Sequence, residues 1–195
     1  MTMQLLATRL SHYSRKVRIL LDHYGLAYEL VDVGNVASPD PAQFDGNPLM
    51  KIPVLKDQGR WLIESDHIAA YLVRTYDPTD RYEVLTTDPA TLNARAVLNG
   101  VMAEEVKVIL AERTGLDTAP HAFFHKARAA IDQGLRWLEA RAASFRPAQP
   151  RYLEFHLVCL WDHLTHYQLV PLDYPGLASV AAALRAHEAI RRTAP

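Results

Sequence analysis

The sequence predicts a mixed α/β domain followed by an all-α domain, and three features of the chain support this division. Short apolar segments alternate with a helical pattern over residues 3–76. A polar, turn-rich segment, DPTDRYEVLTTD, then follows. Beyond it, apolar residues recur only at helical spacing. We therefore expect an α/β domain over residues 1–78, a linker over 79–87 and a helical domain over 88–195.

The first domain is expected to contain four short strands. Each is an apolar or β-branched segment bounded by turn residues, and the last two form a hairpin around Gln58-Gly59. The strands are predicted over residues 3–8, 28–33, 53–56 and 61–64.

Two helices are expected in the same domain, one after the first strand and one after the hairpin. In the first helix, Val17, Leu20 and Leu21 fall on one face. The second helix ends where Asp77 precedes Pro78. The helices are predicted over 12–24 and 66–76. This order gives a mixed sheet with helices packed on it.

The second domain is expected to be a set of four helices. Asp88 before Pro89 forms a good N-cap and first-turn pair for the first of them. The third helix is apolar on nearly every side, which is typical of a helix buried in the middle of a domain. The helices are predicted over 89–113, 119–143, 152–170 and 177–187.

Composition excludes several classes of function. The net charge of −1 offers no basic surface for a nucleic acid, so we expect no such partner. No apolar run reaches 18 residues and the N-terminus lacks the pattern of a signal peptide, so we expect no membrane segment. The single cysteine, Cys159, allows no internal disulfide, which fits a cytoplasmic location.

Pro53 stands at the start of a predicted strand, where proline cannot donate to the ladder. A cis Ile52-Pro53 bond would leave the backbone N–H and C=O of Ile52 free to pair with an extended peptide ligand. The alternative is a trans proline that begins an edge strand. The residue pattern alone leaves both open.

Two further segments place hydroxyl groups at helix N-termini. Glu64 and Ser65 lie where a strand passes into a helix, so Ser65 could hold a ligand carboxylate and Glu64 a ligand ammonium group. Ser11 precedes the first helix and could donate a hydrogen bond to an anionic sulfur. The alternative in each case is a plain helix cap without a ligand.

Taken together, three stretches resemble the glutathione transferase family, in the right order and spacing. They are S-x-x-x-R-K-V-R from Ser11, N-P-L-x-K-I-P-V-L from Asn47 and E-S-x-x-I-x-x-Y-L from Glu64. The chain resembles the bacterial serine or cysteine type of this family, similar to the omega and zeta classes. The resemblance implies a thioredoxin-like first domain with a cis proline, an all-helical second domain, glutathione as co-substrate without a metal, a homodimer and a role in detoxification.

The resemblance also assigns roles to particular residues. Ile52, beside cis-Pro53, would pair through its backbone with the cysteinyl part of glutathione. Glu64 and Ser65 would hold the γ-glutamyl end, and Ser11 falls at the position of the activating serine or cysteine. A tyrosine mechanism is not expected, because the matching stretch at the end of the first strand is Leu-Ala-Thr.

The chain departs from the family pattern at two places. His12 stands where many relatives have a proline, so His12 or Thr8 could share or replace the role of Ser11. The central helix opens with Arg151-Tyr152-Leu153-Glu154 rather than with a Ser/Thr-x-x-Asp capping box, so the cap hydroxyl is missing.

The predicted function is an enzyme that activates the thiol of glutathione for attack on a small electrophile, with isomerase or peroxidase chemistry as variants. The alternative is a non-catalytic glutathione-binding or regulatory protein of the same fold. The residues that could ligate a metal on the central helix lack a second ligand cluster, so no metal site is expected. They are Asp162, His156, His163 and His166.

Overall fold

The computed structural model describes residues 2–195 and divides into two compact units. The first comprises residues up to Leu85 together with His187–Pro195, and the second comprises Thr86–Ala186. The first holds a four-stranded sheet and the second is helical. The predicted fold class, a mixed α/β part followed by an all-α part, is confirmed.

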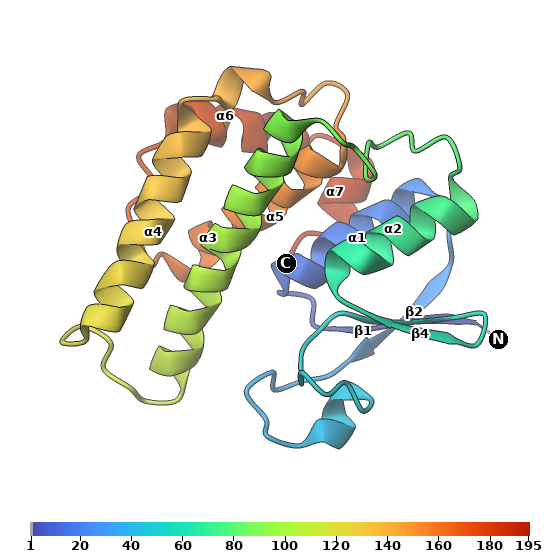
Figure 1. The fold of residues 1–195 in the computed structure, drawn as a ribbon, viewed down its shortest axis with the longest axis horizontal. Helices are drawn as coiled ribbons and strands as arrows, with labels where there is room; N and C mark the ends of the chain where they lie inside the picture. The colour runs from blue at the N-terminus through green and yellow to red at the C-terminus, as the bar shows by residue number, and fades with distance from the viewer. Residues whose placement is uncertain (1) are drawn as a thin grey trace. The chain divides into compact units, whose positions relative to one another are not determined.

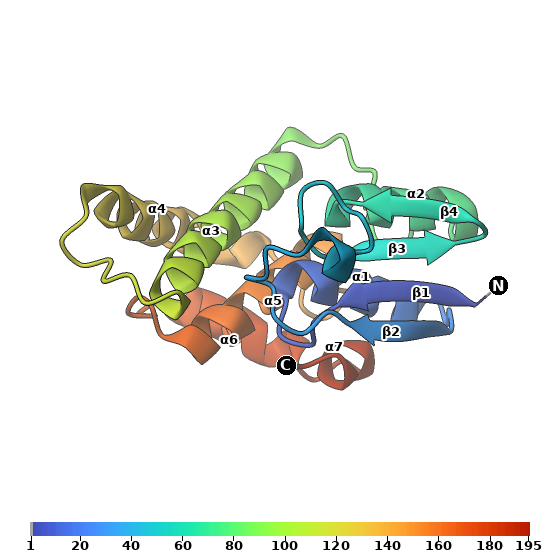
Figure 2. The ribbon, with the colours of Figure 1, turned by 90° about the horizontal axis from the view of Figure 1, so that it is seen from below.

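The sheet of the first unit has the strand order β2-β1-β3-β4 (Figure 2). β1 pairs in parallel with β2, and β3 pairs antiparallel with both β1 and β4. The parallel pair is joined by α1, as a parallel connection requires. The strands are β1 (Met3–Ala7), β2 (Tyr28–Asp32), β3 (Val54–Asp57) and β4 (Arg60–Ile63).

Two helices, α1 (His12–His23) and α2 (Ser65–Tyr76), cover one face of the sheet, and the segment that contains η1 (Pro41–Phe44) lies on the other (Figure 1). The short 3₁₀ helix η1 was not predicted. Neighbouring side chains of β3 alternate between these two sides, as a pleated strand dictates.

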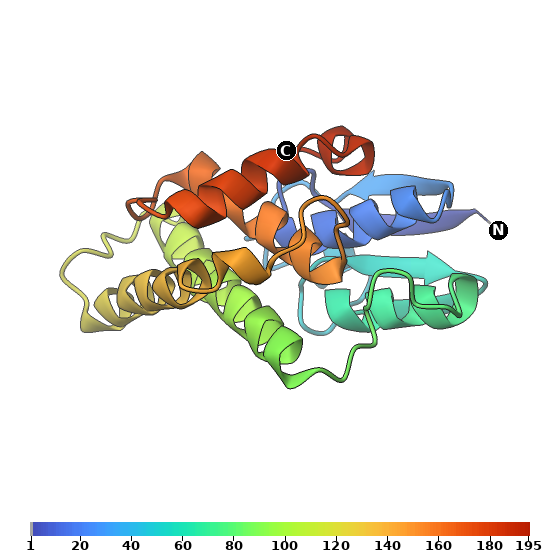
Figure 3. The same cartoon turned by 90° about the horizontal axis from the view of Figure 1, so that it is seen from above.

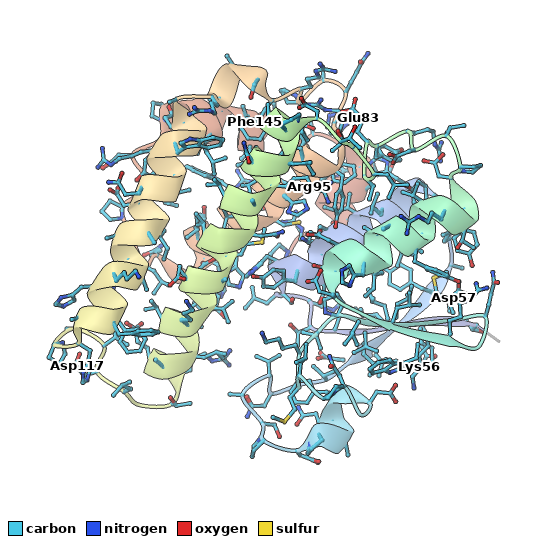
Figure 4. All side chains as sticks on the ribbon, viewed as in Figure 1. Lys56, Asp57, Glu83, Arg95, Asp117 and Phe145 are labelled. Atoms are coloured by element: carbon cyan, nitrogen blue, oxygen red, sulfur yellow. The ribbon has the colours of Figure 1, made fainter. Side chains whose placement is uncertain are left out.

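Lys56 and Asp57, labelled in Figure 4, illustrate this alternation. Lys56 pairs with Asp45 of the η1 segment at 2.6 Å. Asp57 accepts hydrogen bonds from the hydroxyls of Tyr71 and Tyr76 on α2, at 2.8 and 2.6 Å. Polar contacts on both faces therefore fix the strand that follows Pro53.

The chain end belongs to the first unit, which differs from the helical domain expected over 88–195. A short helix, α7 (Glu188–Arg192), packs on α1 (Figure 3). The guanidinium of Arg15 on α1 is buried and donates to the carbonyl of Ile190 at 3.1 Å. Arg192 lies 3.7 Å from Asp22 at the other end of α1. The predicted last helix, 177–187, corresponds to α6, which begins at Pro175 and ends at Leu184, and α7 beyond it was not predicted.

The second unit contains four main helices, and α3 and α4 pack side by side (Figure 1). As predicted, Asp88 caps α3, where its carboxylate accepts from the N–H of Thr91 at 2.8 Å. The helix observed in place of the one predicted over 119–143 is shorter at both ends. It begins after its N-cap, His121, and residues near its predicted end form a separate 3₁₀ helix, η2 (Ala142–Ser144). The helices are α3 (Pro89–Arg113), α4 (Ala122–Glu139), α5 (Tyr152–Tyr167) and α6 (Pro175–Leu184).

The helix α5 is buried along almost its whole length, as its all-round apolar character predicts. Cys159 lies within it and is 1% exposed. The helix ends at Tyr167 rather than at residue 170, because Gln168 adopts a left-handed conformation with φ of 53°. Within residues 2–195, no helix is long and apolar enough to cross a membrane.

Candidate functional site

The strand register brings the predicted site residues of the first unit to one edge of the sheet. Leu6 of β1 pairs with Val54 of β3, which pairs with Ile63 of β4. These positions are the end of β1, the start of β3 and the end of β4. The loop with Ser11, the Ile52-Pro53 bond and the Glu64-Ser65 junction therefore all leave the sheet at the same edge.

Ser11 is the N-cap of α1, and its hydroxyl oxygen accepts from the N–H of Ser14 at 3.2 Å. The hydroxyl of Ser14 also donates to the same oxygen, at 3.1 Å. Ser11 is half-buried, whereas Ser14 is fully buried. The capping role that the sequence left open is therefore real, and it leaves the proton of the Ser11 hydroxyl available to donate.

The two auxiliary candidates differ in their surroundings. Thr8 follows β1 and is half-buried, and its carbonyl accepts from the N–H of Ser11 at 3.3 Å. His12 is the first residue of α1 and is only 2% exposed, with its ring 4.4 Å from the ring of Tyr13. The side chain of His12 therefore packs into the protein, while the hydroxyl of Ser11 stays partly accessible.

The Ile52-Pro53 bond is cis, as predicted. The preceding loop is organised by Asn47, which is 1% exposed. Its amide donates to the carbonyl of Lys51 at 2.7 Å, and its carbonyl oxygen accepts from the N–H of Leu49 at 3.0 Å. The side chain of Ile52 packs against the cluster of Leu6, Val33 and Val54. This packing, together with the hydrogen bond from Asn47 to Lys51, fixes the backbone at Ile52.

Glu64 has an unusual backbone conformation, with φ of 74° and ψ of 121°. A residue with a side chain adopts positive φ at a cost, and such strain persists where the surrounding structure enforces it. Its carboxylate accepts from the N–H of Asp66, two residues further along the chain, at 3.0 Å, so Glu64 is the N-cap of α2. The helix consequently starts at Ser65, one residue earlier than predicted.

Ser65 is 1% exposed, and its hydroxyl lies 3.5 Å from the Glu64 carboxylate. Because the Glu64 carboxylate caps the N-terminus of α2, the Ser65 hydroxyl is not needed as a cap. Both α1 and α2 begin at this edge of the sheet, so the positive ends of two helix dipoles meet the same region. This arrangement favours an anionic ligand.

Lys16 and Asp66 tie the two helices together beside these N-termini. The ammonium of Lys16, whose side chain is fully buried, donates to the Asp66 carboxylate at 2.8 Å. The same ammonium lies 5.6 Å from the centre of the Tyr13 ring. The pair fixes the first turn of α2 relative to α1.

Sequence reasoning did not single out Ser14, Lys16, Asn47 or Asp66, although all four lie inside the three recognised stretches. Ser14 stands three residues after the N-cap, where a polar side chain often completes a cap, so its spacing was a usable signal. The burial of Lys16 had no usable signal in the sequence, since lysine side chains are almost always exposed.

In the second unit, His163 pairs with Glu105 of α3, with 2.8 Å between Nδ1 and the carboxylate oxygen. Burial raises the pKa of the Glu105 carboxyl, and the interaction with His163 offsets this in part. Asp162, which was considered with the histidines, instead forms an ion pair with Arg185. Two of the four candidate residues, His163 and Asp162, therefore contact neighbouring parts of the second unit.

Comparison with known proteins bears on the same residues. Residues 5–80 match the model of the glutathione S-transferase N-terminal domain. A glutathione S-transferase from Methylobacillus flagellatus KT, solved with glutathione bound, is 26% identical with a TM-score of 0.80, and the alignment covers 100% of each chain. The first unit is therefore similar to a glutathione S-transferase N-terminal domain. The whole chain shares the architecture of glutathione S-transferases, a thioredoxin-like unit followed by a helical one.

Other glutathione S-transferase structures extend the comparison. A family member from Pseudomonas fluorescens Pf-5, with bound glutathione, is 26% identical with a TM-score of 0.81, and the alignment covers 100% of this chain and 99% of that one. A maleylacetoacetate isomerase from Methylobacterium extorquens AM1 shares the fold at 23% identity and a TM-score of 0.72, covering 98% and 99%. No curated protein matches the chain. The matched N-terminal domain includes every predicted site residue, from Thr8 to Ser65.

Proposed function

We propose that this protein is a glutathione S-transferase-like enzyme that activates the thiol of glutathione, through Ser11, for attack on a small electrophile. The observation that carries the proposal is the common edge to which β1, β3 and β4 bring Ser11, Ile52-Pro53 and Glu64-Ser65. From β1 to β4 the edge spans two strand spacings, about 10 Å. An extended tripeptide has about the same length.

The cysteinyl part of the tripeptide would pair with the backbone of Ile52, in the manner of an added strand. The cis bond to Pro53 and the hydrogen bonds of Asn47 support this role, because together they define the backbone conformation at Ile52. Its thiol then lies toward the end of β1, where Ser11 caps α1.

Activation of the thiol requires selective stabilisation of its anion. A free thiol has a pKa of about 8.5, and lowering it to about 6.5 takes about 2.7 kcal/mol. One hydroxyl donor to a charged acceptor supplies about 1.5–3 kcal/mol. A helix N-terminus adds about 0.3–1 kcal/mol. Ser11 combines both contributions, so neither a metal nor a general base is required.

The γ-glutamyl end would lie at the start of α2. Its carboxylate accepts from the hydroxyl of Ser65 and from the helix N-terminus, and Glu64 takes the ammonium group. The burial of Ser65 and the capping role of Glu64 support the assignment, because the Ser65 hydroxyl does not cap the helix and makes only a long 3.5 Å contact with the Glu64 carboxylate. The strained backbone of Glu64 is consistent with a residue whose side-chain direction matters.

The second substrate is a small electrophile, and the reaction is conjugation or a glutathione-dependent isomerisation or peroxide reduction. The solved isomerase of the same fold supports including isomerisation. A cytoplasmic location agrees with the single buried cysteine, which leaves the protein without an internal disulfide. A detoxifying role rests on the family resemblance alone.

The functional form would be a homodimer. The resemblance to the family suggests it, and exposed apolar side chains in both units support it. They are Leu49, Met50, Trp61 and Leu85 in the first unit and Leu92, Leu116 and Phe123 in the second. Light scattering should give twice the chain mass of 22.0 kDa at micromolar concentration. A mass of one chain would contradict the dimer.

The proposed activity is tested by binding followed by turnover. The folded protein should be retained on immobilised glutathione and eluted by the free tripeptide. It should then consume glutathione with at least one member of a panel containing an aryl halide, an epoxide and a peroxide. Ser11→Ala should bind glutathione but turn over more slowly. Failure of the folded wild type to bind glutathione would overturn the proposal.

A further inference from the structure

We propose that Ser14 is a positioning residue that orients and polarises the Ser11 hydroxyl, so that two serines act in series on the thiol. The inference rests on the proposed function of Ser11. It starts from the two hydrogen bonds that Ser14 gives to one oxygen: its N–H donates at 3.2 Å and its hydroxyl at 3.1 Å.

The capacity of a hydroxyl group makes this arrangement directional. A serine hydroxyl has one proton to donate and two lone pairs to accept with. Both lone pairs of Ser11 are used by Ser14. The proton of Ser11 therefore points away from Ser14, and the hydroxyl can engage a further group only as a donor. An anionic sulfur needs such a donor.

Ser14 makes a different contact from the usual serine inside a helix. Its hydroxyl donates to the side chain of the N-cap, three residues earlier, rather than to the carbonyl four residues earlier. In a common capping box, the residue at this position instead accepts from the backbone N–H of the N-cap. Here the N–H of Ser11 donates to the carbonyl of Thr8 at 3.3 Å. The hydroxyl of Ser14 is therefore not needed as an acceptor for the Ser11 N–H and donates to the Ser11 hydroxyl oxygen instead.

Burial strengthens the effect. Ser14 is 0% exposed, so water does not compete for its hydroxyl. Hydrogen bonds in a chain polarise one another by about 10–30% per bond. A donor that itself accepts two bonds stabilises an anion more than an isolated hydroxyl does. Removing the hydroxyl of Ser14 should therefore raise the pKa of the bound thiol modestly, by about 0.5 unit against the one to two units expected for Ser11→Ala.

The test is a double-mutant cycle on the thiolate titration of bound glutathione. The wild type is compared with Ser14→Ala, Ser11→Ala and the double variant. Ser14→Ala keeps the backbone N–H that caps the helix, so thermal unfolding should change little. Ser144→Ala in the second unit, which also loses one hydroxyl hydrogen bond, is the matched control and should leave the titration unchanged.

We expect Ser14→Ala to raise the thiol pKa in the wild-type background and to have no effect once Ser11 is alanine. Equal shifts in both backgrounds, or no shift in either, would overturn the role of Ser14 while leaving that of Ser11 intact. If Ser14→Ala fails to fold, Ser14→Cys, which keeps a weak donor, should give a smaller shift in the same direction. A wild type that binds no glutathione would overturn both this inference and the proposed function.

Discussion

Lys16 and Asp66 form an ion pair of 2.8 Å between α1 and α2, and the lysine side chain is completely buried. Ser11 lies five residues before Lys16, and Ser65 lies directly before Asp66. The pair therefore connects the two helix N-termini that we assign to the thiol and γ-glutamyl ends of glutathione. Its placement suggests that it maintains the separation between them.

Removing one partner of this pair should be costly. Asp66→Asn removes the negative charge that faces the buried ammonium of Lys16, and we expect a loss of about 3 kcal/mol in the free energy of unfolding. Chemical denaturation measures it. The more accessible pair Lys56–Asp45, in which both residues are only half-buried, serves as control, and Lys56→Met should cost less than about 1 kcal/mol. Equal losses at the two pairs would show that burial of Lys16 has no energetic consequence.

Ser65→Ala should weaken glutathione binding more than it alters the chemistry. A hydrogen bond to a charged carboxylate is worth about 1.5–3 kcal/mol, so affinity should fall about ten- to a hundredfold. Calorimetric titration with glutathione gives the affinity. The pKa of the bound thiol should stay close to that of the wild type. An unchanged affinity would mean that Ser65 does not contact the tripeptide.

Asp77, at the end of α2, predicts a pH dependence of stability. Burial alone would raise the pKa of its carboxyl, but hydrogen bonds from Thr79 and Arg81 lower the pKa below its ordinary value. Its contribution is therefore present above about pH 4 and is lost as the pH falls through the lowered pKa.

Asp77→Asn should accordingly be less stable than the wild type by about 1–2 kcal/mol at pH 7. The difference should shrink toward zero as the wild-type carboxyl becomes protonated in acid. Urea denaturation of both proteins at several pH values measures it. A difference independent of pH would show that the charge of Asp77 plays no part.

Glu154 should be essential for the second unit. It is completely buried, and its carboxylate accepts from the N–H groups of Arg146 and Arg151, both at 2.8 Å. Glu154→Ala removes the acceptor of both N–H groups, one in the loop before α5 and one at its N-cap, at about 1–3 kcal/mol for each. Thermal unfolding should show a marked loss. Asp132→Ala, on a more exposed part of α4, is the comparison and should be milder.

The fold class and most helices follow from the sequence because their signals are local. Asp88-Pro89 marks the start of α3 correctly, and the all-round apolar pattern of α5 indicates its burial. The end of α5 was predicted three residues too far, because the left-handed Gln168 carries no proline or glycine signal.

The features that the sequence did not predict depend on contacts between distant residues. The hydrogen bond from Arg15 to Ile190 joins residues 175 positions apart, and no local pattern predicts that the chain end returns to α1. The missing cap hydroxyl at Arg151 was noted correctly, but the compensation was not foreseen, since Glu154 also caps the N–H of Arg146. The contact of Ser14 with Ser11 could have been predicted, because a polar residue three positions after the N-cap often completes the cap.

The central claim is that Ser11 stabilises the thiolate of bound glutathione, and the most direct test is the thiolate absorbance of the complex as a function of pH. The wild type should show a bound thiol with a pKa well below the ordinary value of about 8.5. Ser11→Ala should raise that pKa by about one to two units while the fold is retained. Coincident titration curves for the two proteins would contradict the account, and His12→Ala and Thr8→Val would then be titrated in the same way.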